Sequence, residues 1–277
     1  MRADLHVHTT ASDGKLTPQE LIQKAFELKL DVIAITDHDS VEGISPALEA
    51  AKRYTQLLVI PGVEINTDVP KGEVHILGYF IDYLKPELNR TLGELRNSRR
   101  ERGQKMVAKL AEIGINVNWK RVQELAGSGS IGRPHIAQAM LEQGQVSSLR
   151  EAFDKYIGRN GPAYVERKKL TPIEAVQVVL EANGLPVLAH PADIEPLEPF
   201  LLQMKKAGIV GMEVYYAGYN SKTISILKGF AGRLDLVACG GSDFHGIDEY
   251  IGADLGSVNL PGESVERLIS LSQHKGG

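Results

Sequence analysis

The chain has 277 residues, of which 43% are hydrophobic and 24% charged, and its formal net charge is -4. This composition excludes intrinsic disorder, a collagen-like repeat and a coiled coil, and the slightly acidic balance argues against a general cationic surface for nucleic acid or membranes. The length fits one large domain, or one domain that carries a smaller insertion.

The first 80 residues alternate between short apolar runs and amphipathic segments. One amphipathic segment opens with Thr17, Pro18 and Glu20, the pattern of a helix start with a capping box. The apolar runs are rich in β-branched residues, as strands buried on both faces are. We expect strands over 3–7, 31–35, 57–64 and 74–80, and helices over 17–28 and 41–53.

The strand pattern disappears between about residues 82 and 163. Helical periodicity replaces it, with one or two long helices over 84–113 and shorter helices over 119–125, 134–143 and 149–156. We predict that residues 83–163 form an inserted helical domain, or lid.

The alternation of predicted strands and helices resumes after residue 163. A second Thr-Pro-x-Glu helix start occurs at Thr171, and we expect helices over 171–183, 197–207, 222–232 and 265–272, with strands over 186–189, 211–214 and 234–239. Strand–helix alternation with apolar strands predicts a parallel α/β barrel made of residues 1–82 and 164–277.

The single cysteine, Cys239, lies in an apolar run and is predicted to be a buried thiol. It cannot form an intramolecular disulfide, which fits a reducing compartment. The sequence shows neither the apolar segment of a signal peptide nor a run of about 18 apolar residues. We therefore expect a cytoplasmic protein with no membrane contact, and no protein partner is evident.

Histidine and carboxylate side chains gather where predicted strands end or begin. Because the carboxyl ends of barrel strands converge at one mouth, these residues should meet there. A single such histidine is usually structural, but the joint pattern favours a site for zinc, manganese or iron. The nine candidate metal ligands are His6, His8, Asp13, His38, Glu64, His75, His190, Asp243 and His245. Nine ligands suit two or three ions bridged by carboxylates, and Glu64 is the expected bridge.

Two more carboxylates are expected beside the ligands. Asp37 would orient a ligand or a helix start, and Glu213 would either support a ligand or cap the core.

Four segments closely resemble the signature motifs of the PHP (polymerase and histidinol phosphatase) family: DLHVHTTASDG at 4–14, ITDHD at 35–39, PGVE at 61–64 and GSDFH at 241–245. The resemblance implies a distorted (β/α)7 TIM-like barrel. It also implies three divalent metal ions, manganese first, with iron or zinc as alternatives.

The helical insertion and the segment IGRPH at 131–135 resemble the branch of 3′,5′-nucleoside bisphosphate phosphatases and 5′-to-3′ exoribonucleases. This resemblance implies that Arg133 and His135 contact phosphate, with Tyr216 as a further substrate contact. Phosphomonoesters would be hydrolysed by a metal-activated hydroxide. Arg133 would neutralise charge, and His135 would orient the phosphate or protonate the leaving group. Expected substrates are 3′-phosphoadenosine 5′-phosphate or short 5′-phosphorylated RNA, and AMP or phosphate are the expected product ligands.

Three alternatives remain open: a histidinol phosphate phosphatase, a metal-dependent amidohydrolase and a non-catalytic metal- or nucleotide-binding module. No lysine follows a predicted strand among the motifs, which disfavours amide hydrolysis. A basic run in the insertion is predicted to be a solvated helix face, with guidance of an RNA backbone as the alternative. It comprises Arg96, Arg99, Arg100, Arg102 and Lys105.

Overall fold

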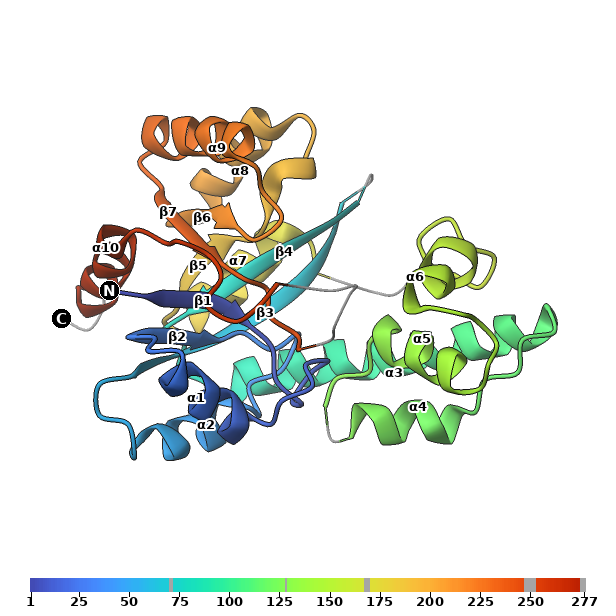
Figure 1. Ribbon diagram of the computed structural model, residues 1–277. Coiled ribbons are helices and arrows are strands. Elements are labelled where there is room, and N and C mark those ends of the chain that lie inside the picture. The colour runs from blue at the N-terminus through green and yellow to red at the C-terminus, as the bar shows by residue number, and fades with distance from the viewer. Residues whose placement is uncertain (70–71, 128, 167–169, 247–252, 275–277) are drawn as a thin grey trace.

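A computed structural model describes residues 1–69, 72–127, 129–166, 170–246 and 253–274. Seven strands form one sheet in sequence order: β1 (Ala3–Val7), β2 (Val32–Ile35), β3 (Leu58–Val69), β4 (Gly72–Tyr79), β5 (Leu185–Leu188), β6 (Gly211–Tyr216) and β7 (Val237–Gly241). Val7 in β1 bridges Phe244, just beyond β7, so the sheet curls into a nearly closed barrel (Figure 1). The predicted α/β barrel is confirmed.

One strand runs against the predicted direction. β4 is antiparallel to both β3 and β5, whereas every other neighbouring pair is parallel. The expectation of a wholly parallel barrel is therefore wrong at β4. Only two residues separate β3 from β4, and such a short connection permits only antiparallel pairing, because a parallel crossover needs a dozen or more residues. As a result, His75 near the start of β4 lies at the barrel mouth.

The helices that cover the barrel start within three residues of the predicted positions. They are α1 (Pro18–Glu27), α2 (Ile44–Ala51), α7 (Pro172–Glu181), α8 (Leu197–Ala207), α9 (Ser221–Arg233) and α10 (Gly262–Gln273), with a 3₁₀ turn, η2, at Pro191–Asp193. Helices α2 and α10 differ most from the prediction. Both α1 and α7 begin with a complete capping box. Figure 1 shows α1 and α2 on one side of the barrel and α8 and α9 on the other.

Two groups of buried side chains hold the barrel together. The inner group fills the barrel with residues such as Leu5, Ile60 and Tyr79, and Cys239 is buried among them as predicted. The Tyr79 hydroxyl donates a hydrogen bond to the Leu5 carbonyl, which satisfies the polar end of this ring. The outer group lies between the sheet and the surrounding helices.

The helical region stands beside the barrel mouth (Figure 1). It contains α3 (Pro86–Glu112), α4 (Trp119–Ala126), α5 (Arg133–Glu142) and α6 (Leu149–Ala152), which continues as a π-helical turn, η1 (Phe153–Ile157). Of the one or two long helices expected over 84–113, the structure has one, with 27 residues. Within the described ranges, no helix combines the length and apolar character needed to cross a membrane.

Helix α3 joins the two parts of the molecule. Leu88 and Leu92 in its first half pack with the outer barrel group, whereas Met106 and Leu110 in its second half pack with the core of the helical region. The division at residues 82/83 and 163/164 stays a prediction, since α3 contributes to both cores.

Candidate metal centre and its pocket

A β-bulge aims the first two histidines into the barrel. The register between β1 and β2 shifts between Asp4 and Val7. Leu5 before the shift packs in the inner group, and Val7 after it packs in the outer group. The extra residue reverses the side-chain alternation, so His6 and His8 both face inward. Both imidazoles are fully buried at the barrel mouth.

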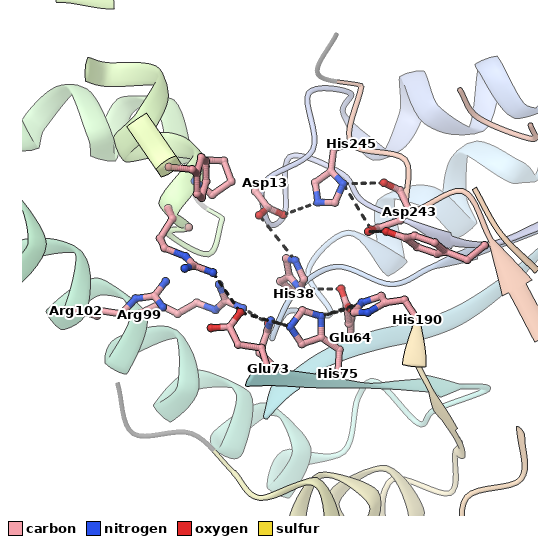
Figure 2. Close-up of a pocket in the computed structure, with 16 residues that line it drawn as sticks. Asp13, His38, Glu64, Glu73, His75, Arg99, Arg102, His190, Asp243 and His245 are labelled. Atoms are coloured by element: carbon pink, nitrogen blue, oxygen red, sulfur yellow. Dashed lines mark hydrogen bonds and ion pairs between the residues drawn. The ribbon is translucent and has the colours of Figure 1, made fainter. Parts of the chain in front are cut away.

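The nine predicted ligands come together in three donor groups. Within each group, the potential ligand atoms lie within 4.8 Å of one another. The groups are His8, Asp13, His38 and His245; His6, His8, Glu64 and Asp243; and Glu64, His75 and His190. His8 and Glu64 each belong to two groups, so the arrangement is continuous. Several of the polar side chains are drawn in Figure 2.

Glu64 occupies the centre of this arrangement. Its Oε2 lies 3.3 Å from both His6 Nε2 and His8 Nε2, and 2.8 Å from His38 Nδ1. Its Oε1 lies 2.7 Å from His75 Nδ1 and 3.4 Å from His190 Nε2. One carboxylate thus faces imidazoles of all three donor groups, as a bridging ligand would.

Several buried polar atoms of the site lie within ion-pair distance of one another but form no hydrogen bond with any described residue. They are His6 Nε2, both ring nitrogens of His8, Asp13 Oδ1, His38 Nδ1 and Glu64 Oε2. Buried polar atoms are rarely left unsatisfied, and a cluster of nitrogen and carboxylate donors is what divalent transition metals bind. The residues therefore fit a metal centre.

Electrostatics keeps Glu64 and His8 in the protonation states that ligands need. Burial raises the pKa of the Glu64 carboxyl, but the charges of His38 and His6 outweigh it and hold this pKa well below the usual range. Burial lowers the pKa of His8 to about 3, and nearby His245 adds to the effect. An ionised carboxylate and a neutral imidazole are the forms that coordinate metals.

The two supporting carboxylates have distinct partners. Asp37 accepts hydrogen bonds from the Thr9 backbone N–H, the Thr9 hydroxyl and the Ser12 hydroxyl, at 2.7, 2.8 and 2.6 Å. It thereby orders the loop that carries Asp13. Glu213 lies 3.1 Å from His6 Nδ1 and accepts the His190 backbone N–H at 2.8 Å. Such contacts fix the orientation of neighbouring imidazoles.

A cavity of about 260 Å³ opens beside the donor groups. Seven of the nine predicted ligands line one side, together with Tyr216, whose hydroxyl donates to Asp243 Oδ2 at 2.9 Å. Arg99, Arg102 and Arg133 line the cavity as well, and we call these three residues the arginine wall. Figure 2 shows Arg99 and Arg102 across the cavity from His245 and Asp243.

Two residues of the arginine wall contradict the predicted solvated helix face. Arg99 and Arg102 are each only 5% exposed. Arg99 Nε donates to Asp39 Oδ2 at 2.6 Å, and its guanidinium also contacts the Asn66 amide oxygen. A signal was available, because residues 88, 92, 95, 99, 102, 106 and 110 repeat at helical spacing and form the buried stripe of α3.

Arg133 and His135 open helix α5 at the cavity. Arg133 lines the cavity and forms an ion pair with Glu73 at 3.2 Å. His135 Nδ1 accepts the Gly132 backbone N–H at 3.0 Å, so the neutral ring carries its proton on Nε2. Burial lowers the pKa of His135. His135 is not one of the described residues that line the cavity.

Comparisons with known proteins agree with this geometry. Residues 4–166 match the PHP domain. The chain is 35% identical over 247 residues to the 5'-3' exoribonuclease Rnm of Escherichia coli, covering 87% of this chain and 84% of that protein. It is 33% identical over 269 residues to the 3',5'-nucleoside bisphosphate phosphatase of Chromobacterium violaceum, covering 93% and 92%.

A solved structure shows the same fold. A proposed metal-dependent phosphoesterase from Bifidobacterium adolescentis superposes with a TM-score of 0.88 at 29% sequence identity, covering 97% of this chain and 95% of that one. The similarity therefore extends over the barrel and the helical region together.

Proposed function

The chain belongs to the PHP domain family and is a hydrolase of phosphoric esters, and on this premise we propose that it removes phosphate from nucleotides. The proposed substrates are 3′,5′-nucleoside bisphosphates and short RNA with a 5′ phosphate. The observation that carries the proposal is the cavity, which has metal-ligand donors on one side and the arginine wall on the other.

We propose that the nine donors hold three divalent ions, one in each donor group, with manganese as the first candidate and iron or zinc as alternatives. When bound, such ions lower the pKa of water and neutralise charge on phosphoryl oxygens. Two carboxylates hold the ligands in place. Asp37 anchors the loop that carries Asp13, and Glu213 contacts the His6 ring and the His190 backbone.

The arginine wall supports a substrate with two phosphate groups. A guanidinium fork matches phosphate geometry, and its charge is permanent. Arg133 is proposed to neutralise the phosphoryl group that is transferred, while Arg99 and Arg102 bind a second phosphate of the same nucleotide. Tyr216, which donates to Asp243, would orient both that carboxylate and the substrate.

His135 is better suited to orient phosphate contacts than to protonate a leaving group. Its lowered pKa keeps the ring neutral near pH 7, and a neutral imidazole is a weak acid. Because its Nδ1 accepts the Gly132 N–H, the ring fixes the start of α5 and with it the backbone of Arg133.

Histidinol phosphate is the less favoured substrate. It carries one phosphate and a cationic amine, and three arginines in one cavity repel a cation.

The test is phosphate release by the manganese-loaded enzyme from 3′-phosphoadenosine 5′-phosphate, short 5′-phosphorylated RNA, AMP and histidinol phosphate. Selective turnover of the bisphosphate or the RNA is the expected result. Turnover of histidinol phosphate alone would overturn the substrate proposal. Bound metal without any turnover would favour a non-catalytic module.

A further inference from the structure

A second cavity lies outside the metal centre. It measures about 240 Å³ and sits between the middle of α3, helix α4 and the segment that leads into α5. Arg96, Asn97 and Arg100 line it from α3, Gln123 lines it from α4, and Ser130 lines it from the connecting segment. These side chains offer guanidinium, amide and hydroxyl donors, and no described residue lining this cavity carries a carboxylate.

The two cavities are adjacent, because the segment at 131–132 and helix α3 border both of them. Ile131 lines the second cavity, and the next residue, Gly132, lines the cavity at the metal centre. Helix α3 also borders both, with Arg99 and Arg102 at the metal centre and Arg96 and Arg100 at the second cavity. A linear anionic ligand held at the metal centre therefore finds further cationic donors next to it.

The second cavity contains donors that the fold does not use. Ser130 is 2% exposed, and its hydroxyl has no hydrogen-bond partner in the described residues. A buried hydroxyl without a partner is unfavourable in the free protein and is expected to be satisfied by a ligand or water. Arg100 is exposed and forms no ion pair with any other described residue, whereas Arg96 is held by the Asp39 carbonyl and by Glu42.

We infer that this second cavity binds a phosphodiester group of a single-stranded RNA whose 5′ end occupies the metal centre. The inference rests on the proposed function and adds how a longer substrate is held. The cavity at the metal centre, about 260 Å³, is below the roughly 300–1,000 Å³ typical of small-molecule sites, so it has room for at most one nucleotide. The RNA that follows this nucleotide must extend out of the metal-centre cavity, and we infer that the second cavity binds its next phosphate group.

The test compares the turnover of a mononucleotide with that of a short RNA. We expect Arg100→Ala to lower kcat/KM for a 5′-phosphorylated tetraribonucleotide about tenfold, the scale of one lost charge-assisted hydrogen bond. Turnover of 3′-phosphoadenosine 5′-phosphate should stay within about twofold of wild type, since that substrate does not reach the second cavity. The matched control is Arg90→Ala, which removes an exposed arginine of the same helix that lines neither cavity.

A binding measurement separates this inference from the proposed function. Fluorescence anisotropy of a labelled tetraribonucleotide with the full chain in EDTA reads binding without turnover. Arg100→Ala should reduce the slope of log affinity against log salt concentration by about 0.7, the value for one phosphate contact on a single strand. If the wild-type enzyme turns over neither substrate, the proposed function fails and anisotropy alone decides the inference.

Ser130→Ala provides a second variant. Removing an unpartnered buried hydroxyl should leave the free energy of unfolding unchanged or slightly higher, yet weaken binding of the tetraribonucleotide. Equal losses on mononucleotide and tetraribonucleotide, or unchanged RNA binding in both Arg100→Ala and Ser130→Ala, would overturn the inference.

Discussion

The carboxylate of Glu64 is the residue on which the geometry of the metal centre depends most directly. Both of its oxygens face imidazoles, so Glu64→Gln replaces an acceptor in the centre of the site by an N–H donor. We expect the variant to bind fewer ions per chain and to release phosphate at least roughly 100-fold more slowly. Metal analysis together with phosphate release checks this, with Glu49→Gln as a surface control. Wild-type metal content and rate would contradict the role of Glu64.

Asp37 acts on the site through hydrogen bonds. In Asp37→Asn, one side-chain oxygen becomes an N–H₂ group that faces the donors of Thr9 and Ser12. We expect the free energy of unfolding to fall by about 1–3 kcal/mol, the cost of unsatisfied buried groups. Metal content should fall too, because the loop carrying Asp13 loses its anchor.

Urea unfolding and metal analysis measure both effects of Asp37→Asn. Ser12→Ala, which removes one partner and adds no donor, should have the smaller effect on each. If Asp37→Asn retained wild-type stability and metal content, Asp37 would not position the loop.

The candidate ligands and Arg133 could be singled out at this scale, whereas Arg99 and Arg102 were expected to face solvent. His6 and His8 are two residues apart, a spacing that puts both side chains on one face, and in the structure both face the inside of the barrel at the register shift between Asp4 and Val7. Arg99 and Arg102 look like solvent-facing charges in a run rich in Arg and Glu. Helical spacing places both on the buried stripe of α3, but it does not reveal Asp39 and Asn66, the partners of Arg99 in distant parts of the chain.

At the scale of elements, the ion pair between Arg99 and Asp39 joins α3 to the turn after β2. Both side chains are buried, and Asp39 has a positive φ of 50° that its backbone contacts maintain. Removing one member of a buried pair leaves an uncompensated charge, so Arg99→Met should lower the free energy of unfolding by roughly 3–5 kcal/mol. Chemical denaturation measures this.

A double-mutant cycle with Asp39→Asn gives the coupling within this pair. If the ion pair dominates, Arg99→Met combined with Asp39→Asn should be less destabilised than the sum of the single variants. Additive effects would mean that each side chain acts through other contacts.

The direction of β4 could not be predicted from the residues of the strand itself. The apolar run over 74–80 has the length and composition of any barrel strand, and nothing in it encodes direction. The evidence lay outside the strand, in the absence of a helix-length segment between it and the preceding strand. The helix predicted over 149–156 was found in the right place, but its change to π geometry at Phe153 has no counterpart in the helical periodicity of the sequence.

At the scale of the whole molecule, the barrel mouth collects charges that must be balanced by either ions or protons. Burial lowers the pKa of His245, but Asp13 and Asp243 outweigh it and raise this pKa from 6.5 to about 9. In the metal-free protein, protonated His245 therefore contributes stability that is complete below about pH 6.5 and is lost as the pH rises towards 9. At 1.36 kcal/mol per pKa unit, the contribution is about 3 kcal/mol.

Bound metal should weaken this pH dependence. Metal ions take the place of protons on ligands and add stability that grows with free metal concentration. We expect the Tm of the chelator-treated protein to fall between pH 6.5 and 9, while the Tm of the manganese-loaded protein stays higher and falls less. Thermal unfolding at several pH values with EDTA or manganese measures the difference.

Two histidine variants identify the origin of the pH effect. His245→Gln should flatten the fall in Tm of the metal-free protein, whereas His274→Gln, in the exposed tail, should leave it unchanged. The pKa of His6, which its neighbouring carboxylates also raise above its usual range, acts in the same direction, so part of the fall should persist in His245→Gln. A Tm that rose with pH in the presence of EDTA would show that protons do not balance the carboxylates at the mouth.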